Sequence, residues 1–211
     1  MGSIAELIKI IGQKARSASE TLRIASTDQK NNALISIASQ IQQNKQFILD
    51  ANDLDLKAAR ENSIDDALLD RLMLNDERLD SVVEGLHQIS TLVDPIGQIS
   101  DFKERPSGIK IGKMMVPLGV IGMIYESRPN VTVDAAGLCI KSGNAIILRG
   151  GSEAINSNIA FYSCIERGLE EAGLDPNSVQ LIKVTDRAAV IELVSASDYV
   201  DAIIPRGGKG L

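Results

Sequence analysis

Residues 116–151, which read VPLGVIGMIYESRPNVTVDAAGLCIKSGNAIILRGG, constrain the fold of this chain more than any other segment. Two apolar runs, Gly119–Tyr125 and Ala145–Leu148, each end at a polar cluster that contains an arginine. The segment between them has the length of a helix, so the pattern predicts two parallel strands joined by a crossover helix. Because ligands bind at the carboxyl ends of such strands, we expect ESRPN and RGGSE to meet at one sheet edge and form a binding site.

The alternation of strands and helices continues to the end of the chain. Further helices are expected at Val131–Lys141, at Ala154–Ala172 and from Thr185 or Asp186 through Val194, and further strands at Asn144–Leu148, Val179–Val184 and Val200–Ile204. The pattern predicts an α/β fold with a parallel, Rossmann-like sheet covered on both faces. The last strand is followed by PRGGKGL rather than by a helix. We therefore expect residues 119–211 to form a domain that is incomplete at its C-terminus, in a chain that is a fragment or a truncated product.

Residues 1–93 repeat apolar side chains at helical spacing, as at Ile4, Leu7 and Ile8. Asn75 is expected to cap a helix that begins at Asp76, where an acidic residue suits the positive end of the helix dipole. The segment therefore predicts a set of helices that pack on the rest of the protein.

Residues 94–118 differ from the helices before them. Ile109 and Ile111 alternate with other residues at the period of a strand, and Arg105–Gly108 has the composition of a turn. The pattern predicts a hairpin that projects from the body. Since exposed strand edges need partners, we expect this hairpin to contribute to a homo-oligomer contact.

Composition narrows the function classes. The chain of 211 residues has a net charge of −6, which argues against a nucleic-acid-binding protein. The sequence contains no uninterrupted run of about 18 apolar residues, so no membrane span is expected. The N-terminus lacks the apolar core of a signal peptide. Cys139 and Cys164 are too few for a disulfide framework and fit no zinc pattern, and no metal site is expected around His87. These features favour a cytoplasmic protein.

Four arginines follow the expected strands, in the loops that should share one sheet edge. They are Arg128, Arg149, Arg187 and Arg206. Guanidinium groups match the geometry of phosphate and carboxylate, so the cluster predicts an anionic ligand; the alternative is that each arginine is simply solvated. The glycine pairs at 150–151 and 207–208 would let a ligand approach the backbone, or they merely permit tight turns. Neither pair completes a G-x-G-x-x-G fingerprint, and GGKGL is not a P-loop.

Three segments, PLGVIGMIYESRPNVTVDAA, KSGNAIILRGGSEA and IIPRGGKGL, strongly resemble the gamma-glutamyl phosphate reductase (glutamate-5-semialdehyde dehydrogenase) family of the aldehyde dehydrogenase superfamily, as does ALLDRLMLNDERLD. The resemblance implies NADPH-dependent reduction of L-glutamyl 5-phosphate to the semialdehyde and phosphate in proline biosynthesis, with glutamate kinase as a functional partner. The family uses a cysteine thiolate of a catalytic domain that would follow this segment. The chain alone is therefore expected to be inactive.

The resemblance also implies roles for individual residues. Asn130 would stabilise an oxyanion, although Glu126 or Arg128 could take that place in the loop. Arg149 and Ser152 would neutralise the 2′-phosphate of NADP. The substrate would contact Glu126, Ser127 and Arg128, and the cofactor would contact Arg149, Gly150, Gly151, Ser152, Glu153, Pro205, Gly207 and Gly208. The alternative function is a non-catalytic module that binds a phosphate metabolite or assembles through the hairpin.

Overall fold

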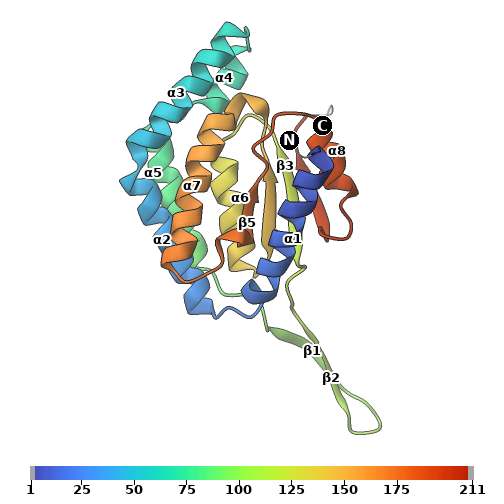
Figure 1. The fold of residues 1–211 in the computed structure, drawn as a ribbon. Coiled ribbons are helices and arrows are strands. Elements are labelled where there is room, and N and C mark those ends of the chain that lie inside the picture. Colours follow the sequence, from blue (N-terminus) through green and yellow to red (C-terminus); the bar gives the residue numbers. More distant parts are fainter. Residues whose placement is uncertain (1–2, 209–211) are drawn as a thin grey trace.

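The computed structural model describes residues 3–208, which form an α/β fold around a parallel sheet (Figure 1). The helices are α1 (Ile4–Leu22), α2 (Thr27–Gln43), α3 (Lys45–Glu61), α4 (Asp66–Leu72), α5 (Asp76–Thr91), α6 (Asn130–Lys141), α7 (Ile155–Glu171) and α8 (Ala188–Ser195). The strands are β1 (Ile99–Glu104), β2 (Lys110–Met114), β3 (Val120–Tyr125), β4 (Ala145–Arg149), β5 (Val179–Leu181) and β6 (Ala202–Arg206), and the short 3-10 turns are η1 (Ser152–Ala154) and η2 (Pro176–Ser178).

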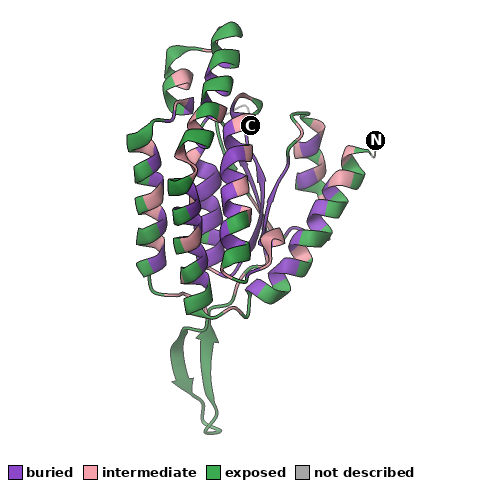
Figure 2. Cartoon of the chain, turned by 60° about the vertical axis from the view of Figure 1, so that its left-hand side comes forward, coloured by how far each residue is buried: buried purple, intermediate pink, exposed green. Residues whose placement is uncertain are grey.

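The sheet has the strand order β5-β4-β3-β6, with every neighbouring pair parallel. All residues of β3 are buried, and their side chains alternate between two cores. Ile121 and Met123 pack with α2, α5, α6 and α7 on one face, whereas Val120 and Ile124 pack with α1 and α8 on the other. Figure 2 shows the buried sheet between these two layers. The predicted α/β fold with a doubly covered parallel sheet is therefore confirmed.

The N-terminal helices do not form one bundle beside the sheet. The helix α1 covers one face with α8, while α2 and α5 form an outer layer over α6 and α7 on the other. Their starts follow local sequence signals, because Ser26 and Gln29 form a reciprocal capping box at α2. The Asn75 side chain accepts a hydrogen bond from the Arg78 amide at 2.8 Å, which confirms it as the cap of α5.

The antiparallel pair β1–β2 projects away from the body, as predicted (Figure 1). Its turn closes with a hydrogen bond from the Gly108 amide to the Arg105 carbonyl at 2.8 Å. Every residue of both strands is exposed, including the large apolar side chains of Phe102 and Ile111.

Several strand boundaries differ from the predictions. The strand β5 ends at Leu181 rather than Val184, because it pairs only with β4 and loses its partner where β4 ends. The strand β6 runs from Ala202 to Arg206 rather than from Val200 to Ile204, and β4 runs from Ala145 to Arg149 rather than from Asn144 to Leu148. Just before β6, the Asp201 carboxylate accepts hydrogen bonds from the Val120 amide and the Arg16 guanidinium, each at 2.7 Å. The Asp201 amide donates to the Val120 carbonyl at 2.8 Å, and the paired register with β3 begins at Ala202.

None of the helices in residues 3–208 combines the length and the hydrophobicity that a membrane-spanning helix needs. The cytoplasmic location expected from the sequence stays a prediction.

Candidate functional site

The carboxyl ends of β3, β4 and β6 lie side by side. In the pairing register, Tyr125 faces Arg206 and Ile124 faces Arg149. In the sheet, β4 lies beside β3 and β5 lies beside β4, whereas the next strand, β6, lies on the opposite side of β3. The direction in which successive strands are added therefore reverses between β3 and β6. Ligands of parallel sheets bind outside the strand ends at such a reversal. The predicted meeting of three polar loops at one sheet edge is therefore confirmed.

Two carboxylates of these loops connect them directly. Glu153, in the turn η1 after β4, accepts hydrogen bonds at Oε1 from the Ser127 amide at 2.6 Å and from the Ser127 hydroxyl at 2.8 Å. Glu126 accepts a hydrogen bond from the Gly208 amide at 3.1 Å. The loop after β3 thus contacts the loops after both of its neighbours in the sheet.

Arg149 is held by the backbone around it. Its side chain is 7% exposed, and its Nη2 donates to the Thr185 carbonyl at 3.0 Å while Nη1 donates to the carbonyl of Gly150. Its Nε is buried and has no hydrogen-bond partner among residues 3–208. Burial lowers the pKa of the guanidinium, and the neighbouring charge of Glu153 opposes that effect. Arg149 therefore supplies a fixed positive charge at the end of β4.

The glycine pair after β4 is enclosed by the protein's own side chains. A Cβ at Gly150 would lie 2.2 Å from Asn158 Nδ2, and a Cβ at Gly151 would lie 2.1 Å from Glu153 Oε1. Both glycines are thus explained by packing. Of the other residues predicted to contact the cofactor, Ser152, Pro205, Gly207 and Gly208 are exposed at the same sheet edge.

The start of α7 is already capped from another helix. The carboxylate of Asp55, on α3, accepts hydrogen bonds from the Ser157 amide at 2.8 Å and from the Asn156 amide at 3.1 Å. Asp55 is 2% exposed. The Asn156 and Ser157 amides at this helix start are therefore bound by a buried carboxylate and are not available to a phosphate.

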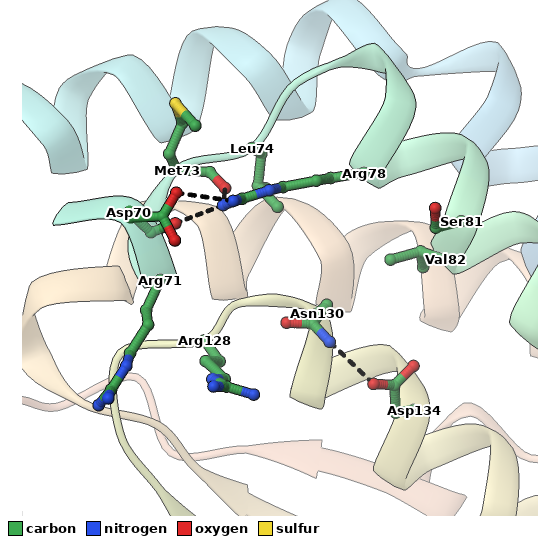
Figure 3. Close-up of a pocket in the computed structure, with 10 residues that line it drawn as sticks. All are labelled: Asp70, Arg71, Met73, Leu74, Arg78, Ser81, Val82, Arg128, Asn130 and Asp134. Atoms are coloured by element: carbon green, nitrogen blue, oxygen red, sulfur yellow. Dashed lines mark hydrogen bonds and ion pairs between the residues drawn. The ribbon is translucent and has the colours of Figure 1, made fainter. Parts of the chain in front are cut away.

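A pocket of about 390 Å³ opens beside the loop after β3 (Figure 3). One wall comes from α4, α5 and their connection, and the other from Arg128 and the start of α6. The lining residues are Asp70, Arg71, Met73, Leu74, Arg78, Ser81, Val82, Arg128, Asn130 and Asp134. The pocket thus brings Arg128 and Asn130, which the sequence singled out, together with Arg71 and Arg78, which it did not.

The three arginines of this pocket differ in how they are held. Arg78 Nη2 donates to Asp70 Oδ1 at 2.8 Å, and its Nη1 donates to the Met73 carbonyl at 2.7 Å. The exposed side chains of Arg71 and Arg128 make no hydrogen bond or ion pair within the described part of the chain. Two guanidinium groups are therefore free to bind an anion.

Asn130 is engaged by a neighbour on its own helix. Its Nδ2 donates to Asp134 Oδ2 at 2.9 Å (Figure 3). Burial raises the pKa of Asp134, although the Asn130 hydrogen bond and the charge of Arg206 act in the opposite direction. The amide that would stabilise an oxyanion is thus committed to a carboxylate in this structure, and the role assigned to Asn130 stays a prediction.

The four arginines predicted in the loops fall into two groups along the sheet edge, and two of them, Arg149 and Arg206, are the last residues of β4 and β6 rather than loop residues. Arg187 lies close enough to Arg149 for its charge to lower the pKa of that guanidinium further. Arg206 acts instead on Asp134, in the wall of the pocket that Arg128 also lines. The edge therefore carries one cationic region after β4 and β5 and another after β3 and β6.

The cysteines are buried, as expected. Burial raises the pKa of Cys139 to about 12 and that of Cys164 to about 11, so both thiols stay protonated near neutral pH. In the range 3–208, no group of three or more His, Cys, Asp or Glu side chains is arranged to hold a metal ion.

Comparison with known proteins identifies the group to which this fold belongs. No protein-family model matches the chain. A curated gamma-glutamyl phosphate reductase of Ruthia magnifica subsp. Calyptogena magnifica is 61% identical over all 211 residues, which cover 50% of that relative. The crystal structure of gamma-glutamyl phosphate reductase from Thermotoga maritima superimposes with a TM-score of 0.94 at 43% identity, over 97% of this chain and 49% of the other.

More distant structures share the fold alone. A probable aldehyde dehydrogenase from Listeria monocytogenes has a TM-score of 0.72 at 16% identity, over 97% of this chain and 42% of the other. An engineered glycolyl-CoA reductase with bound NADP+ has a TM-score of 0.69 at 16% identity, over 96% and 43%. The chain spans about half the length of the curated relatives that it matches. It belongs to the gamma-glutamyl phosphate reductase family, and its fold is that of the aldehyde dehydrogenases.

Proposed function

We propose that this chain binds NADPH and L-glutamyl 5-phosphate as part of a reductase that forms L-glutamate 5-semialdehyde and phosphate in proline biosynthesis. The names of its relatives support this reaction, and the arginine-lined pocket is the observation that carries the substrate assignment. Since the substrate is an acyl phosphate of glutamate, a glutamate kinase is the functional partner that would supply it.

The pocket suits a substrate with anionic groups at both ends. Arg71 and Arg128 reach it from different elements, and each guanidinium can bind a phosphoryl or carboxylate group through paired hydrogen bonds. Arg78, held by Asp70 and the Met73 carbonyl, adds a fixed charge to the same wall. We assign the substrate to this pocket, with Arg128 as its contact from the sheet edge.

The residues after β4 and β5 fit a phosphorylated dinucleotide. Arg149 and Arg187 place two positive charges close together, Ser152 is exposed in the turn after β4, and the Arg149 Nε is a buried donor without a partner in residues 3–208. We assign the 2′-phosphate of NADPH to this region, and Gly207 and Gly208 to its pyrophosphate. When bound, the cofactor would supply the hydride for the reduction. The glycolyl-CoA reductase noted above, which binds NADP+ on this fold, supports a nicotinamide cofactor.

Titration with NADPH and NADH tests the cofactor assignment. We expect NADPH to bind at least about tenfold more tightly than NADH, the effect of one charge-assisted contact to the 2′-phosphate. Arg149→Met should remove this preference. Equal affinity for the two nucleotides, or no binding of either, would overturn the assignment.

Turnover by the chain alone is not expected, because both of its cysteines are buried, protonated thiols. An activity assay with NADPH and L-glutamyl 5-phosphate tests this expectation. Full turnover by the 211-residue chain would show that the nucleophile lies within it.

We also propose that the β1–β2 hairpin binds a second copy of the chain. Its apolar side chains are open to solvent, with Phe102 at 64% and Ile109 at 61% exposure, and both of its edges lack a strand partner within residues 3–208. Sedimentation of the chain should show a dimer or larger assembly that Phe102→Ser weakens. A monomer at all concentrations would exclude this role.

A further inference from the structure

Glu153 occupies a position between the two cationic regions of the sheet edge. Its Oε1 accepts both hydrogen bonds that Ser127 can donate, from the amide at 2.6 Å and from the hydroxyl at 2.8 Å. The same carboxylate lies near enough to Arg149 to raise the pKa of that guanidinium. Glu153 therefore interacts with the loop that carries Arg128 and with the residue assigned to the cofactor.

The turn that Glu153 contacts has an unfavourable backbone. Ser127 has a φ of 48°, in the left-handed region that residues with a Cβ rarely adopt. Ser127 is only 7% exposed, so the water that could otherwise satisfy its amide and hydroxyl is largely excluded. Both groups instead rely on one carboxylate, which stabilises the left-handed conformation.

Independent packing around Gly151 supports the same placement of the carboxylate. A Cβ at this position would lie 2.1 Å from Glu153 Oε1 and 2.4 Å from Oε2. The absence of a side chain at Gly151 thus leaves the space that the Glu153 carboxylate fills. Its position is set by the loop after β4 as well as by Ser127.

We infer that Glu153 is a positioning residue, which fixes the turn at Ser127 and thereby directs Arg128 into the arginine-lined pocket. This inference rests on the proposed function, in which Arg128 contacts the anionic substrate. Arg128 follows Ser127 directly, and its side chain has no partner of its own in the described part of the chain, so its direction depends on the backbone of the turn. Glu153 would then act on substrate binding, whereas the family resemblance implied that it contacts the cofactor.

A comparison of Glu153→Ala, Glu153→Gln and the wild-type chain tests the inference with two binding titrations and one NMR signal. The titrations use a phosphonate analogue of L-glutamyl 5-phosphate and NADPH. We expect Glu153→Ala to weaken phosphonate binding on the order of tenfold, the size of one lost hydrogen bond to a charged group, with NADPH binding nearly unchanged. Glu153→Gln keeps an acceptor oxygen for Ser127 and should restore most of the phosphonate affinity.

A double-mutant cycle shows whether Glu153 acts through Arg128. In an Arg128→Ala background, Glu153→Ala should cause no further loss of phosphonate affinity. Glu170→Ala is the matched control, since this exposed glutamate at the C-terminal end of α7 makes no side-chain hydrogen bond within residues 3–208 and does not line the pocket, and it should leave phosphonate binding unchanged. Additive losses in the cycle would overturn the positioning role.

The Ser127 amide proton reports the turn without any ligand. A strong hydrogen bond to the carboxylate should move its resonance downfield, and Glu153→Ala should move it back while Glu170→Ala does not. If the wild-type chain binds no phosphonate, the proposed function fails, yet this resonance still decides whether Glu153 holds the turn. An unchanged Ser127 resonance in Glu153→Ala, or lost NADPH binding with intact phosphonate binding, would refute the inference.

Discussion

Replacement of Asp55 by alanine tests how far the start of α7 depends on a carboxylate from another helix. Asp55 is 2% exposed and accepts hydrogen bonds from the Asn156 amide, the Asn156 side chain at 2.8 Å, the Ser157 amide, and the Ser157 hydroxyl at 2.6 Å. Asp55→Ala removes all four acceptor contacts and leaves the Ser157 amide in a site where the whole residue is 0% exposed.

The cost follows from which donors can reach other partners. The Asn156 groups are partly exposed and can bind water. The Ser157 hydroxyl still accepts a hydrogen bond from the Asn52 side chain at 3.0 Å, but it loses the acceptor for its own proton. The buried Ser157 amide loses its acceptor, which costs about 1–3 kcal/mol, and loss of the helix cap and the remaining charged hydrogen bonds adds a similar amount. We expect the free energy of unfolding to fall by about 3–5 kcal/mol. For a chain of this size, that corresponds to a Tm lowered by roughly 6–20 °C.

Urea unfolding followed by circular dichroism measures this change. Asp53→Ala is the matched control, because Asp53 lies on the same helix, is exposed and makes no side-chain hydrogen bond within residues 3–208. We expect the control to stay within about 0.5 kcal/mol of the wild-type chain. A free energy of unfolding for Asp55→Ala within about 1 kcal/mol of the control would show that the carboxylate is not what stabilises the start of α7.

Three further predictions concern packing, pH and thiol reactivity. Gly168→Ala should lower the free energy of unfolding by about 1–3 kcal/mol in a denaturation experiment, because the added Cβ would lie 2.6 Å from the Ile37 backbone nitrogen where α7 crosses α2. Burial opposes ionisation of Asp94, but the hydrogen bond from Lys30 and weaker contacts outweigh it and lower its pKa. The stabilisation that the Asp94 carboxylate contributes is therefore complete above its unfolded pKa of about 3.9 and should disappear as pH falls through the lower folded pKa. In Asp94→Asn, the free energy of unfolding should therefore differ less between pH 7 and pH 3 than it does in the wild-type chain. Burial raises the pKa of Cys139 to about 12, so a thiol reagent should label it at neutral pH only as fast as the chain opens, and immediate labelling would contradict its buried position.

The sheet could be predicted because its signals are local. The six residues of β3 form one continuous apolar run, and the glycines that end α6 and α7 have the positive φ values that a helix stop requires, 69° at Gly143 and 71° at Gly173. The boundaries that the sequence placed wrongly depend on distant contacts. The start of β6 is set by Asp201, which contacts an arginine 185 residues earlier in the chain, and no local pattern reveals that pair.

The same distinction between local sequence signals and distant contacts applies to the residues of the candidate site. The rule for parallel strands placed Arg128 and Arg149 at one edge without any knowledge of side chains. No sequence pattern predicted that Arg71 and Arg78 would lie in the pocket. The segment that carries them is held in place by buried polar contacts with a distant part of the chain. Asn52 accepts a hydrogen bond from the Leu74 amide at 2.8 Å and donates to the Leu72 carbonyl at 2.8 Å. These contacts join α3 to a segment about 20 residues later, at no helical or strand period.

The two cationic regions of the edge explain why carboxylates lie among its arginines. Both proposed ligands carry phosphoryl groups, and the proposed reduction would bring them to neighbouring strand ends. A continuous row of guanidinium groups would attract either ligand to either region and would also destabilise the fold through repulsion, as the effect of Arg187 on the pKa of Arg149 shows. Glu153 lies near Arg149 in the region after β4 and β5, and Asp134 lies near Arg206 in the region after β3 and β6. Each region therefore contains an acid that offsets part of its positive charge. Arg128, Arg187 and Arg206 all make no side-chain hydrogen bond or ion pair within residues 3–208, but of these three only Arg128 lines the pocket, so its charge is the one that a substrate bound there can use.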